Sequence, residues 1–219
     1  MKQQPLLDLP PPDPFRLEKT FHAQGINIIA GVDEAGRGCL AGPVVAAAVI
    51  LNPQDSIKGL KDSKMLSARE RDRLFDEISS RALAAGVGIV GPDEIDRINI
   101  LQASLLAMRI AVDELKVRPM QILIDGDQPI EHSIPQKVVV KGDKISNSIA
   151  AASIIAKVTR DRLMCDLEKK YPAFKFSVHK GYGTELHLAE LAQHGPTPIH
   201  RKTFRGVMNI DLELRSGAR

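Results

Sequence analysis

Three apolar runs of this sequence lead into acidic residues, and this feature restricts the possible fold more than any other. The runs span residues 26–32, 122–124 and 138–140, and the acids that follow them are Asp33, Glu34, Asp125 and Asp143. Short apolar runs bounded by turn residues are typical of buried strands. Ligands gather at strand ends in open α/β sheets. We therefore expect one sheet that brings these carboxylates together.

Helical patterns alternate with the expected strands. Ser67 and Glu70 form a capping box before a helix with an apolar stripe that ends at Ala82. Further helices are expected over residues 101–115, from a cap at Ser146 or Asn147 to Pro172, and from Thr184 to Gln193. Residues 43–51 and 86–90 read as strands, the first antiparallel to residues 26–33. The alternation predicts an α/β fold.

The length of 219 residues and the 43% hydrophobic content suit one domain with a sizeable core. Five prolines within residues 1–20 predict a flexible lead-in, which leaves residues 21–219 as a single domain. No apolar run has the length of a membrane span, and no secretory core is seen. Cys39 and Cys165 have no close-spaced partner, which fits a reducing cytoplasm.

Charge is distributed unevenly along the chain. Residues 1–136 contain 15 Lys and Arg against 19 Asp and Glu, whereas residues 137–219 contain 15 against 8, a net charge of +7. A basic C-terminal part beside an acidic cluster suggests a polyanionic partner. An ordinary solvated basic surface would give the same pattern.

Carboxylates from several strand ends are the oxygen ligands that hard divalent ions such as Mg²⁺ prefer. Four of them would suit two ions about 4 Å apart, as in nucleases and polymerases that cleave phosphodiesters. Each acid taken alone could be a turn residue, and Asp127 competes with Asp125 on spacing. The coincidence of three such strand ends favours the metal site.

Two phosphate-binding patterns are incomplete. Residues 31–36 have Walker spacing, but Arg37 and Gly38 stand where lysine and Ser or Thr are required. Residues 86–91 match a dinucleotide pattern by letters, yet lie inside an expected strand. The histidines show no metal-ligand spacing, so we expect surface or hydrogen-bonding roles for His179, His187, His194 and His200.

A series of motifs in residues 26–207 resembles bacterial ribonuclease HII, the type 2 ribonuclease H family. These motifs are GVDEAGRG, LAGPVVAAAVIL, DSKMLS, EIDRINI, LIDGD, VVKGDKISNSIAAASIIAKVTRDR, HKGYGT and HGPTPIHRKTF. The resemblance implies a ribonuclease H-like fold with a central mixed sheet flanked by helices and a C-terminal helical part. It also implies a metal-dependent endonuclease, using Mg²⁺ or Mn²⁺, that leaves 5′-phosphates. The implied substrates are RNA–DNA hybrids and DNA containing ribonucleotides, incised 5′ of a single ribonucleotide.

The resemblance also assigns roles to residues. It matches Asp33, Glu34, Asp125 and Asp143 to the metal-binding carboxylates, and so selects Asp125 over Asp127. The turn Gly36, Arg37 and Gly38 matches the segment whose backbone contacts the ribose 2′-hydroxyl, the group that distinguishes RNA from DNA. Tyr182 matches the tyrosine that packs on the sugar at the RNA–DNA junction. Phosphate contacts are expected from Lys64, Lys144 and Lys180.

Two positions depart from the family pattern. Cys39 stands where proline usually follows the glycine turn, and Met65 stands where lysine is common. Neither change removes a carboxylate, although Cys39 could alter the stiffness of the turn. Two other functions fit the residues: another two-metal nuclease of the same fold, or a nucleic-acid-binding module without catalysis. We expect a cytoplasmic monomer that needs no protein partner or membrane.

Overall fold

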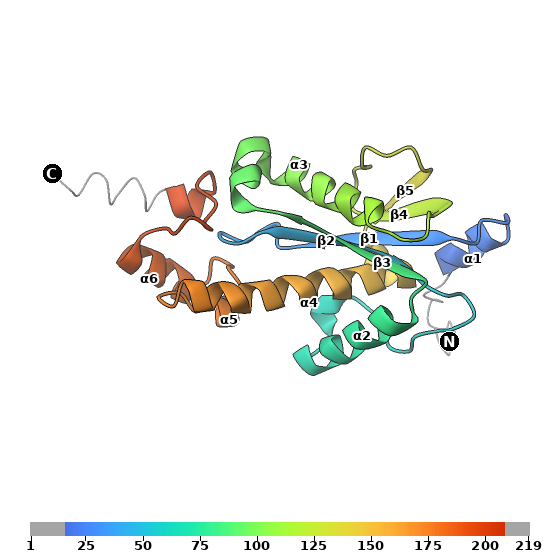
Figure 1. Ribbon diagram of the computed structural model, residues 1–219, viewed down its shortest axis with the longest axis horizontal. Helices are drawn as coiled ribbons and strands as arrows, with labels where there is room; N and C mark the ends of the chain where they lie inside the picture. The colour runs from blue at the N-terminus through green and yellow to red at the C-terminus, as the bar shows by residue number, and fades with distance from the viewer. Residues whose placement is uncertain (1–15, 209–219) are drawn as a thin grey trace, which may run out of the picture.

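A five-stranded mixed sheet forms the centre of the computed structural model, which describes residues 16–208 (Figure 1). The strands are β1 (Ile29–Ala35), β2 (Val44–Ile50), β3 (Ala84–Val90), β4 (Gln121–Asp125) and β5 (Gln136–Val139), in the order β3-β2-β1-β4-β5. β1 and β2 are antiparallel, as predicted, and so are β2 and β3. β4 runs parallel to both β1 and β5, which makes the sheet mixed.

The register of the parallel strands determines where the acids lie. Val32 of β1 pairs with Ile124 of β4, so the residues that follow them, Asp33 and Asp125, reach the same level of the sheet. Asp125 in turn pairs with Val139 at the end of β5. Parallel strands end at the same edge, and this alignment places the acids of β1 and β4 on neighbouring strands.

Helices cover both faces of the sheet. They are α1 (Arg16–His22), α2 (Ala68–Arg81), α3 (Pro92–Asp113), α4 (Asn147–Lys170), α5 (Phe176–His179) and α6 (Glu185–His194), with the short 3₁₀ helices η1 (Ser63–Met65) and η2 (Gly142–Lys144). Figure 1 shows α3 on one face and α4 with α2 on the other. Because both faces are covered, all seven residues of β2 are buried. Within residues 16–208, no helix is long and apolar enough to cross a membrane.

The predicted helix caps are confirmed. Ser67 and Glu70 bond each other reciprocally at the start of α2. Ser146, rather than Asn147, caps α4 by accepting a hydrogen bond from the backbone N–H of Ile149 at 3.2 Å. Thr184 caps α6, and α4 ends at Lys170, just before Pro172. These elements follow local sequence signals.

Helix α3 begins earlier than predicted. It starts at Pro92 instead of residue 101, and its backbone breaks at Asn99, where φ is 67°. The Asn99 side chain accepts hydrogen bonds from the N–H groups of Leu101 and Gln102 at 3.0 and 3.1 Å, as an N-cap does. The predicted apolar spacing therefore described the second half of a kinked helix.

Residues 16–20, which the sequence analysis placed in the flexible lead-in, belong to helix α1. Glu18 of that helix is 3% exposed. Its Oε1 accepts hydrogen bonds from the Ser146 hydroxyl at 2.6 Å and the Ser148 N–H at 3.0 Å, which ties α1 to the start of α4. The rest of the predicted lead-in, residues 1–15, and residues 209–219 lie outside the described residues.

The predicted C-terminal helical part is confirmed, and it has a small core of its own. This core consists of Ala41, Met164, Phe174, Phe176, Leu191 and Val207. Figure 1 shows α5 and α6 at the far end of α4, beyond the end of the sheet. The core includes Ala41, which follows the glycine turn, so the C-terminal part is joined directly to the segment after β1.

Candidate active site

The four predicted carboxylates come from three neighbouring segments of the sheet edge. Asp33 and Glu34 lie near the end of β1, Asp125 is the last residue of β4, and Asp143 lies in η2 just after β5. Asp33 is 8% exposed, and the other three are partly buried. Residues separated by up to 110 positions are thus brought within electrostatic reach of one another.

Short hydrogen bonds hold two of these side chains. Oδ1 of Asp33 accepts a hydrogen bond from the Glu34 N–H at 2.7 Å. Oδ1 of Asp125 accepts one from the Gly142 N–H at 2.7 Å, which links the end of β4 to the residue before Asp143. Each bond leaves carboxylate oxygen free for another ligand.

Burial and mutual repulsion disfavour negative charge in this cluster. Burial is the main cause that raises the pKa of Asp33 well above its usual range, followed by the charges of Glu34, Asp125 and Asp143. Burial also raises the pKa of Glu34, although Arg37 opposes the shift through an ion pair of 3.3 Å. Such a cluster is stabilised by a cation or a proton.

The carboxylate oxygens of the four acids are the ligands that a hard divalent cation prefers. Their side chains are not yet close enough together to share one ion. Within residues 16–208, no group of three or more His, Cys, Asp or Glu side chains is arranged to hold a metal ion. Asp143 lies against Asp62, and burial followed by the charges of Asp62 and Asp125 raises its pKa. Asp62 was not predicted as a site residue, although it belongs to the DSKMLS motif.

The three predicted phosphate-binding lysines lie in different surroundings. Burial raises the pKa of Asp125 and of Asp143, and the charge of Lys64 opposes both shifts, so this lysine lies within electrostatic reach of the carboxylates. Lys144 is exposed in η2. The Lys180 ammonium instead lies 3.1 Å from the Cys165 sulfur, so its side chain is not directed at the carboxylates.

Two buried arginines, which the sequence did not predict as buried, hold the glycine turn. Arg201 donates to the carbonyl oxygens of Gly36 at 2.7 Å and Arg37 at 2.8 Å. Arg160 donates to the carbonyl of Lys180 at 2.8 Å and also contacts the chain after the turn. Gly36 has φ of 97°, and a Cβ there would lie 2.1 Å from Arg160, so the turn requires glycine at this position.

Gly38 has a different environment from Gly36. No atom lies within 4 Å of the position that a Cβ of Gly38 would occupy, and its φ is not in the left-handed region. Glycine is therefore not needed there for the protein's own packing. Open space beside the backbone, close to Asp33 and Glu34, is what the close approach of a ligand requires.

Tyr182 lies beside the segment that follows the glycine turn. It forms an antiparallel bridge with Cys39, and the Leu40 N–H donates to the Gly181 carbonyl at 2.7 Å. The Tyr182 side chain is 40% exposed, with the Lys157 ammonium 5.5 Å from the ring centroid. Cys39 is fully buried, and burial raises the pKa of its thiol, so this unusual residue is shielded and unreactive.

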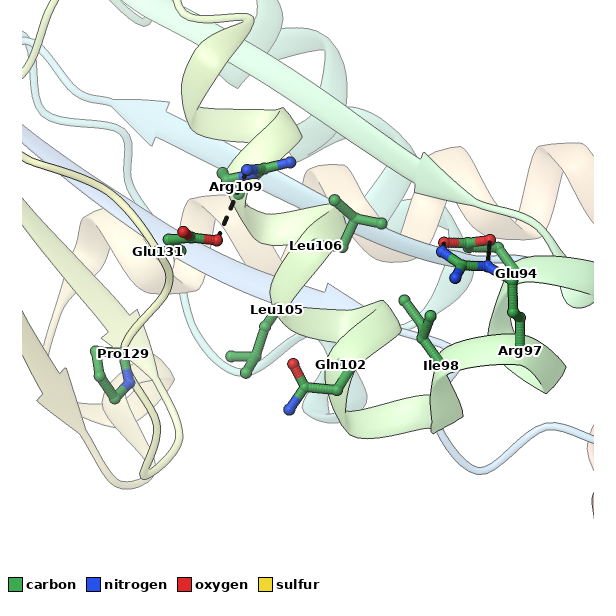
Figure 2. A pocket seen from close by; sticks show the side chains of 9 residues that line it. All are labelled: Glu94, Arg97, Ile98, Gln102, Leu105, Leu106, Arg109, Pro129 and Glu131. Atoms are coloured by element: carbon green, nitrogen blue, oxygen red, sulfur yellow. Dashed lines mark hydrogen bonds and ion pairs between the residues drawn. The ribbon is translucent and has the colours of Figure 1, made fainter.

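One hollow of the surface lies away from the carboxylate site. A cavity of about 460 Å³ runs along α3 and is lined by Glu94, Arg97, Ile98, Gln102, Leu105, Leu106, Arg109, Pro129 and Glu131 (Figure 2). None of the predicted site residues is among them. The carboxylate site is an open edge of the sheet, which suits a long substrate that lies across the surface better than an enclosed small molecule.

Of the four histidines expected at the surface or in hydrogen bonds, three are interior residues. His179, His187 and His200 are buried below the Tyr182 loop, whereas His194 is exposed. No spacing in the sequence indicated this cluster. A signal was nevertheless present, because all three lie within the HKGYGT and HGPTPIHRKTF motifs or in the helix between them.

Comparison with known proteins agrees with this architecture. The sequence model of the family described as Ribonuclease HII matches residues 30–207. A ribonuclease HII of Geobacter metallireducens is 56% identical over 193 residues, which cover 88% of this chain and 91% of that protein. A ribonuclease HII of Pelobacter propionicus is 54% identical over 207 residues, which cover 94% of each chain.

The fold also matches a solved structure. The ribonuclease H2 from Pyrococcus horikoshii OT3 aligns with a TM-score of 0.72 at 30% identity, and the alignment covers 85% of this chain and 98% of that chain. The ribonuclease H-like fold with a mixed sheet is therefore confirmed.

Proposed function

The chain belongs to the ribonuclease HII family, and we propose that it incises duplex DNA on the 5′ side of a single embedded ribonucleotide. Membership makes it a type 2 ribonuclease H, a hydrolase that cleaves RNA in RNA–DNA hybrids with the help of divalent cations. Family membership alone does not define the junction substrate, the residues that act on it or the number of ions.

The observation that carries the proposal is the meeting of Asp33, Glu34, Asp125 and Asp143 at one open edge of the sheet. These four residues would hold two divalent cations, Mg²⁺ or Mn²⁺. When bound, the ions supply an activated water and stabilise the leaving oxygen of the phosphodiester. The chain's own contribution is to bring the four carboxylates to neighbouring strand ends at one edge of the sheet.

The glycine turn recognises the ribose. Gly36, Arg37 and Gly38 follow the metal-binding pair within four residues, so their backbone groups face the sugar whose phosphate lies at the carboxylates. The open space at Gly38 lets that sugar approach. A 2′-hydroxyl both donates and accepts hydrogen bonds, and deoxyribose lacks it.

The remaining contacts position the duplex. Tyr182 packs on the adjacent sugar at the junction, and packing of this kind tolerates deoxyribose. Lys64 faces the phosphate beside the carboxylates, while Lys144 and Lys180 contact phosphates farther away. The enzyme acts in the cytoplasm as a monomer and needs no protein partner.

A cleavage assay tests this function. Three duplexes of equal length are compared with Mg²⁺, with Mn²⁺ and with a chelator: one with a single ribonucleotide, one RNA–DNA hybrid and one all-DNA. We expect metal-dependent cleavage of the first two and a single cut 5′ of the lone ribonucleotide. Equal cleavage of the all-DNA duplex, or a cut only on the 3′ side, would contradict the proposal.

A further inference from the structure

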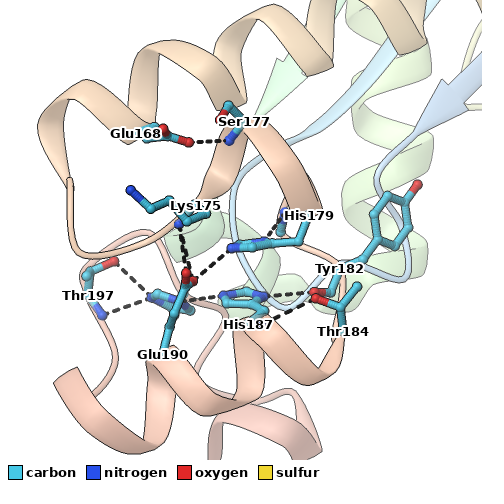
Figure 3. Close-up of polar contacts among 11 residues, drawn as sticks. Glu168, Lys175, Ser177, His179, Tyr182, Thr184, His187, Glu190 and Thr197 are labelled. Atoms are coloured by element: carbon cyan, nitrogen blue, oxygen red, sulfur yellow. Dashed lines mark hydrogen bonds and ion pairs between the residues drawn. The ribbon is translucent and has the colours of Figure 1, made fainter.

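Three buried histidines lie directly beneath the Tyr182 loop and take no part in the proposed chemistry. His179 is 5% exposed, and His187 and His200 are 0% exposed. Figure 3 shows His179 and His187 between the Tyr182 loop and Glu190 of α6. Burial of three ionisable rings at one place is costly unless every polar atom is paired.

The hydrogen bonds determine which ring nitrogen carries the proton in His200 and in His187. The Thr197 N–H can only donate, and it lies 2.9 Å from Nδ1 of His200, so the His200 proton sits on Nε2. His200 Nε2 therefore donates to His187 Nε2 at 3.0 Å. The His187 proton must then be on Nδ1, from which it reaches the Tyr182 carbonyl oxygen at 2.9 Å. This chain runs in one direction from Thr197 to Tyr182.

A second chain holds the neighbouring peptide group. The Gly181 N–H donates to His179 Nδ1 at 3.1 Å, so the His179 proton is on Nε2. His179 Nε2 donates to Glu190 Oε2 at 3.0 Å. The Glu190 carboxylate also accepts from the Lys175 N–H at 3.1 Å. The Gly181 N–H and the Tyr182 carbonyl are thus each bonded to a histidine.

A positive charge on any of these rings would break the arrangement. A second proton on His187 would face the His200 N–H, and one on His179 would face the Gly181 N–H. The rings of His179 and His187 are stacked with centroids 4.1 Å apart. Burial lowers the pKa of His187 to about 4 and of His200 to about 3. Burial also lowers the pKa of His179, although Glu190 and Glu168 oppose that shift.

We propose that His179, His187 and His200 are positioning residues that fix the Tyr182 ring against the junction sugar through three neutral, single-tautomer rings. On the other side of the loop, the Leu40 N–H bonds the Gly181 carbonyl. The peptide groups around Tyr182 are therefore held from both the interior and the glycine turn. This inference rests on the proposed contact between Tyr182 and the sugar. Displacement of a positioning group by about 1 Å is enough to lower the rate of an oriented reaction strongly.

The tautomers can be observed directly in the full-length protein. Nitrogen-15 NMR of histidine side chains at neutral pH separates Nδ1–H, Nε2–H and doubly protonated rings. We expect Nδ1–H for His187, the less common tautomer, and Nε2–H for His179 and His200. An Nε2–H tautomer or a charged ring at His187 would overturn the proposed hydrogen-bond chain.

A pair of substitutions tests the effect on specificity. In His187→Asn, the side-chain amide can occupy the place of Nδ1–H and donate to the Tyr182 carbonyl. In His187→Gln, the amide lies nearer the place of Nε2, so the hydrogen bond to the Tyr182 carbonyl is lost. The readout is kcat/KM on a single-ribonucleotide duplex divided by kcat/KM on a long hybrid. A loss of folded protein cancels in this ratio. We expect His187→Gln to lower the ratio by about tenfold, the effect of one lost buried hydrogen bond, and His187→Asn to retain it.

The same assay separates this inference from the proposed function. His194→Ala, an exposed residue of α6 outside the hydrogen-bond chain, is the control and should keep the wild-type ratio. Tyr182→Ala should lower the ratio. If Tyr182→Ala lowers it but His187→Gln does not, the positioning role is wrong and the proposed function stands. If Tyr182→Ala leaves it unchanged, the proposed Tyr182 contact is wrong and the inference falls with it.

Discussion

Asp33 lies near the end of β1, and the residue is 8% exposed beside Glu34. The folded protein holds the Asp33 proton more tightly than the unfolded chain does, because burial and the neighbouring acids raise its pKa above 3.8. Stability from this residue is therefore fully present at low pH and is lost as the pH rises through the raised pKa. At neutral pH, the charge of Asp33 therefore lowers the stability of the folded protein, and the same cluster of charges attracts cations.

This linkage gives a measurable pH dependence. In chelator, the melting temperature of the wild-type protein should fall relative to Asp33→Asn as the pH rises from about 4 toward 7, because only the wild type ionises at this position. Each kcal/mol corresponds to about 2–4 °C in a domain of this size. Divalent cations should reduce the difference. If the melting temperatures of the two proteins changed in parallel with pH, the pKa of Asp33 would not be raised in the folded protein.

The two glycines of the turn allow a matched comparison. Gly36→Ala should lower the melting temperature, since the new Cβ meets Arg160 at 2.1 Å and φ is 97°, with a cost of at least about 1 kcal/mol. Gly38→Ala should leave the melting temperature unchanged, because its Cβ meets open space. It should still lower kcat/KM by crowding the ribose. Full activity of Gly38→Ala would show that no ligand approaches there.

The elements of the fold differ in how well the sequence predicts them. Strand runs and capped helices were predicted because their signals lie within a few residues of each other, as at Ser67 and Glu70. The burial of Arg201 was missed because its partners, the carbonyls of Gly36 and Gly42, lie about 160 residues away along the chain. The kink at Asn99 was missed because apolar spacing does not report φ. Long-range partners of polar groups are not encoded in local periodicity.

The α1 helix was missed for a similar reason, and its role is testable. Glu18→Ala removes the acceptor for the Ser146 hydroxyl and the Ser148 N–H, so we expect a loss of about 1–3 kcal/mol for the unpaired buried donors. Thermal unfolding of Glu18→Ala should be compared with Thr20→Ala, whose side chain is exposed on the same helix and bonds only within it. Equal melting temperatures for the two variants would show that α1 does not anchor α4.

At the scale of the whole molecule, the net charge of +7 in residues 137–219 overstates the basic surface. Arg160 and Arg201 are 0% exposed and bind backbone carbonyls, so two of the 15 basic residues are structural. Burial lowers the pKa of Arg201 to about 10, which leaves it charged at neutral pH. Lys157, Arg162 and Lys169 are also held in ion pairs, so fewer basic residues are free to contact phosphates than the net charge suggests.

Nucleic-acid binding should therefore weaken with salt. Each phosphate contact contributes a slope of about −0.9 in the logarithm of affinity against the logarithm of salt concentration. We expect Lys64→Ala to reduce that slope by about one contact in a catalytically inactive background. Fluorescence anisotropy with a hybrid duplex at several salt concentrations measures it. An unchanged slope would exclude Lys64 as a phosphate contact.

The most direct test of the carboxylate site compares two aspartates that spacing alone could not separate. Asp125 ends β4 and is held by the Gly142 N–H, whereas Asp127 is exposed two residues later. Single-turnover cleavage of a single-ribonucleotide duplex with Mg²⁺ should fall by more than about 100-fold in Asp125→Asn, since even the outer partners of metal ligands cost 10–100-fold. Asp127→Asn should cleave at the wild-type rate. Near-normal cleavage by a folded Asp125→Asn protein would contradict the account.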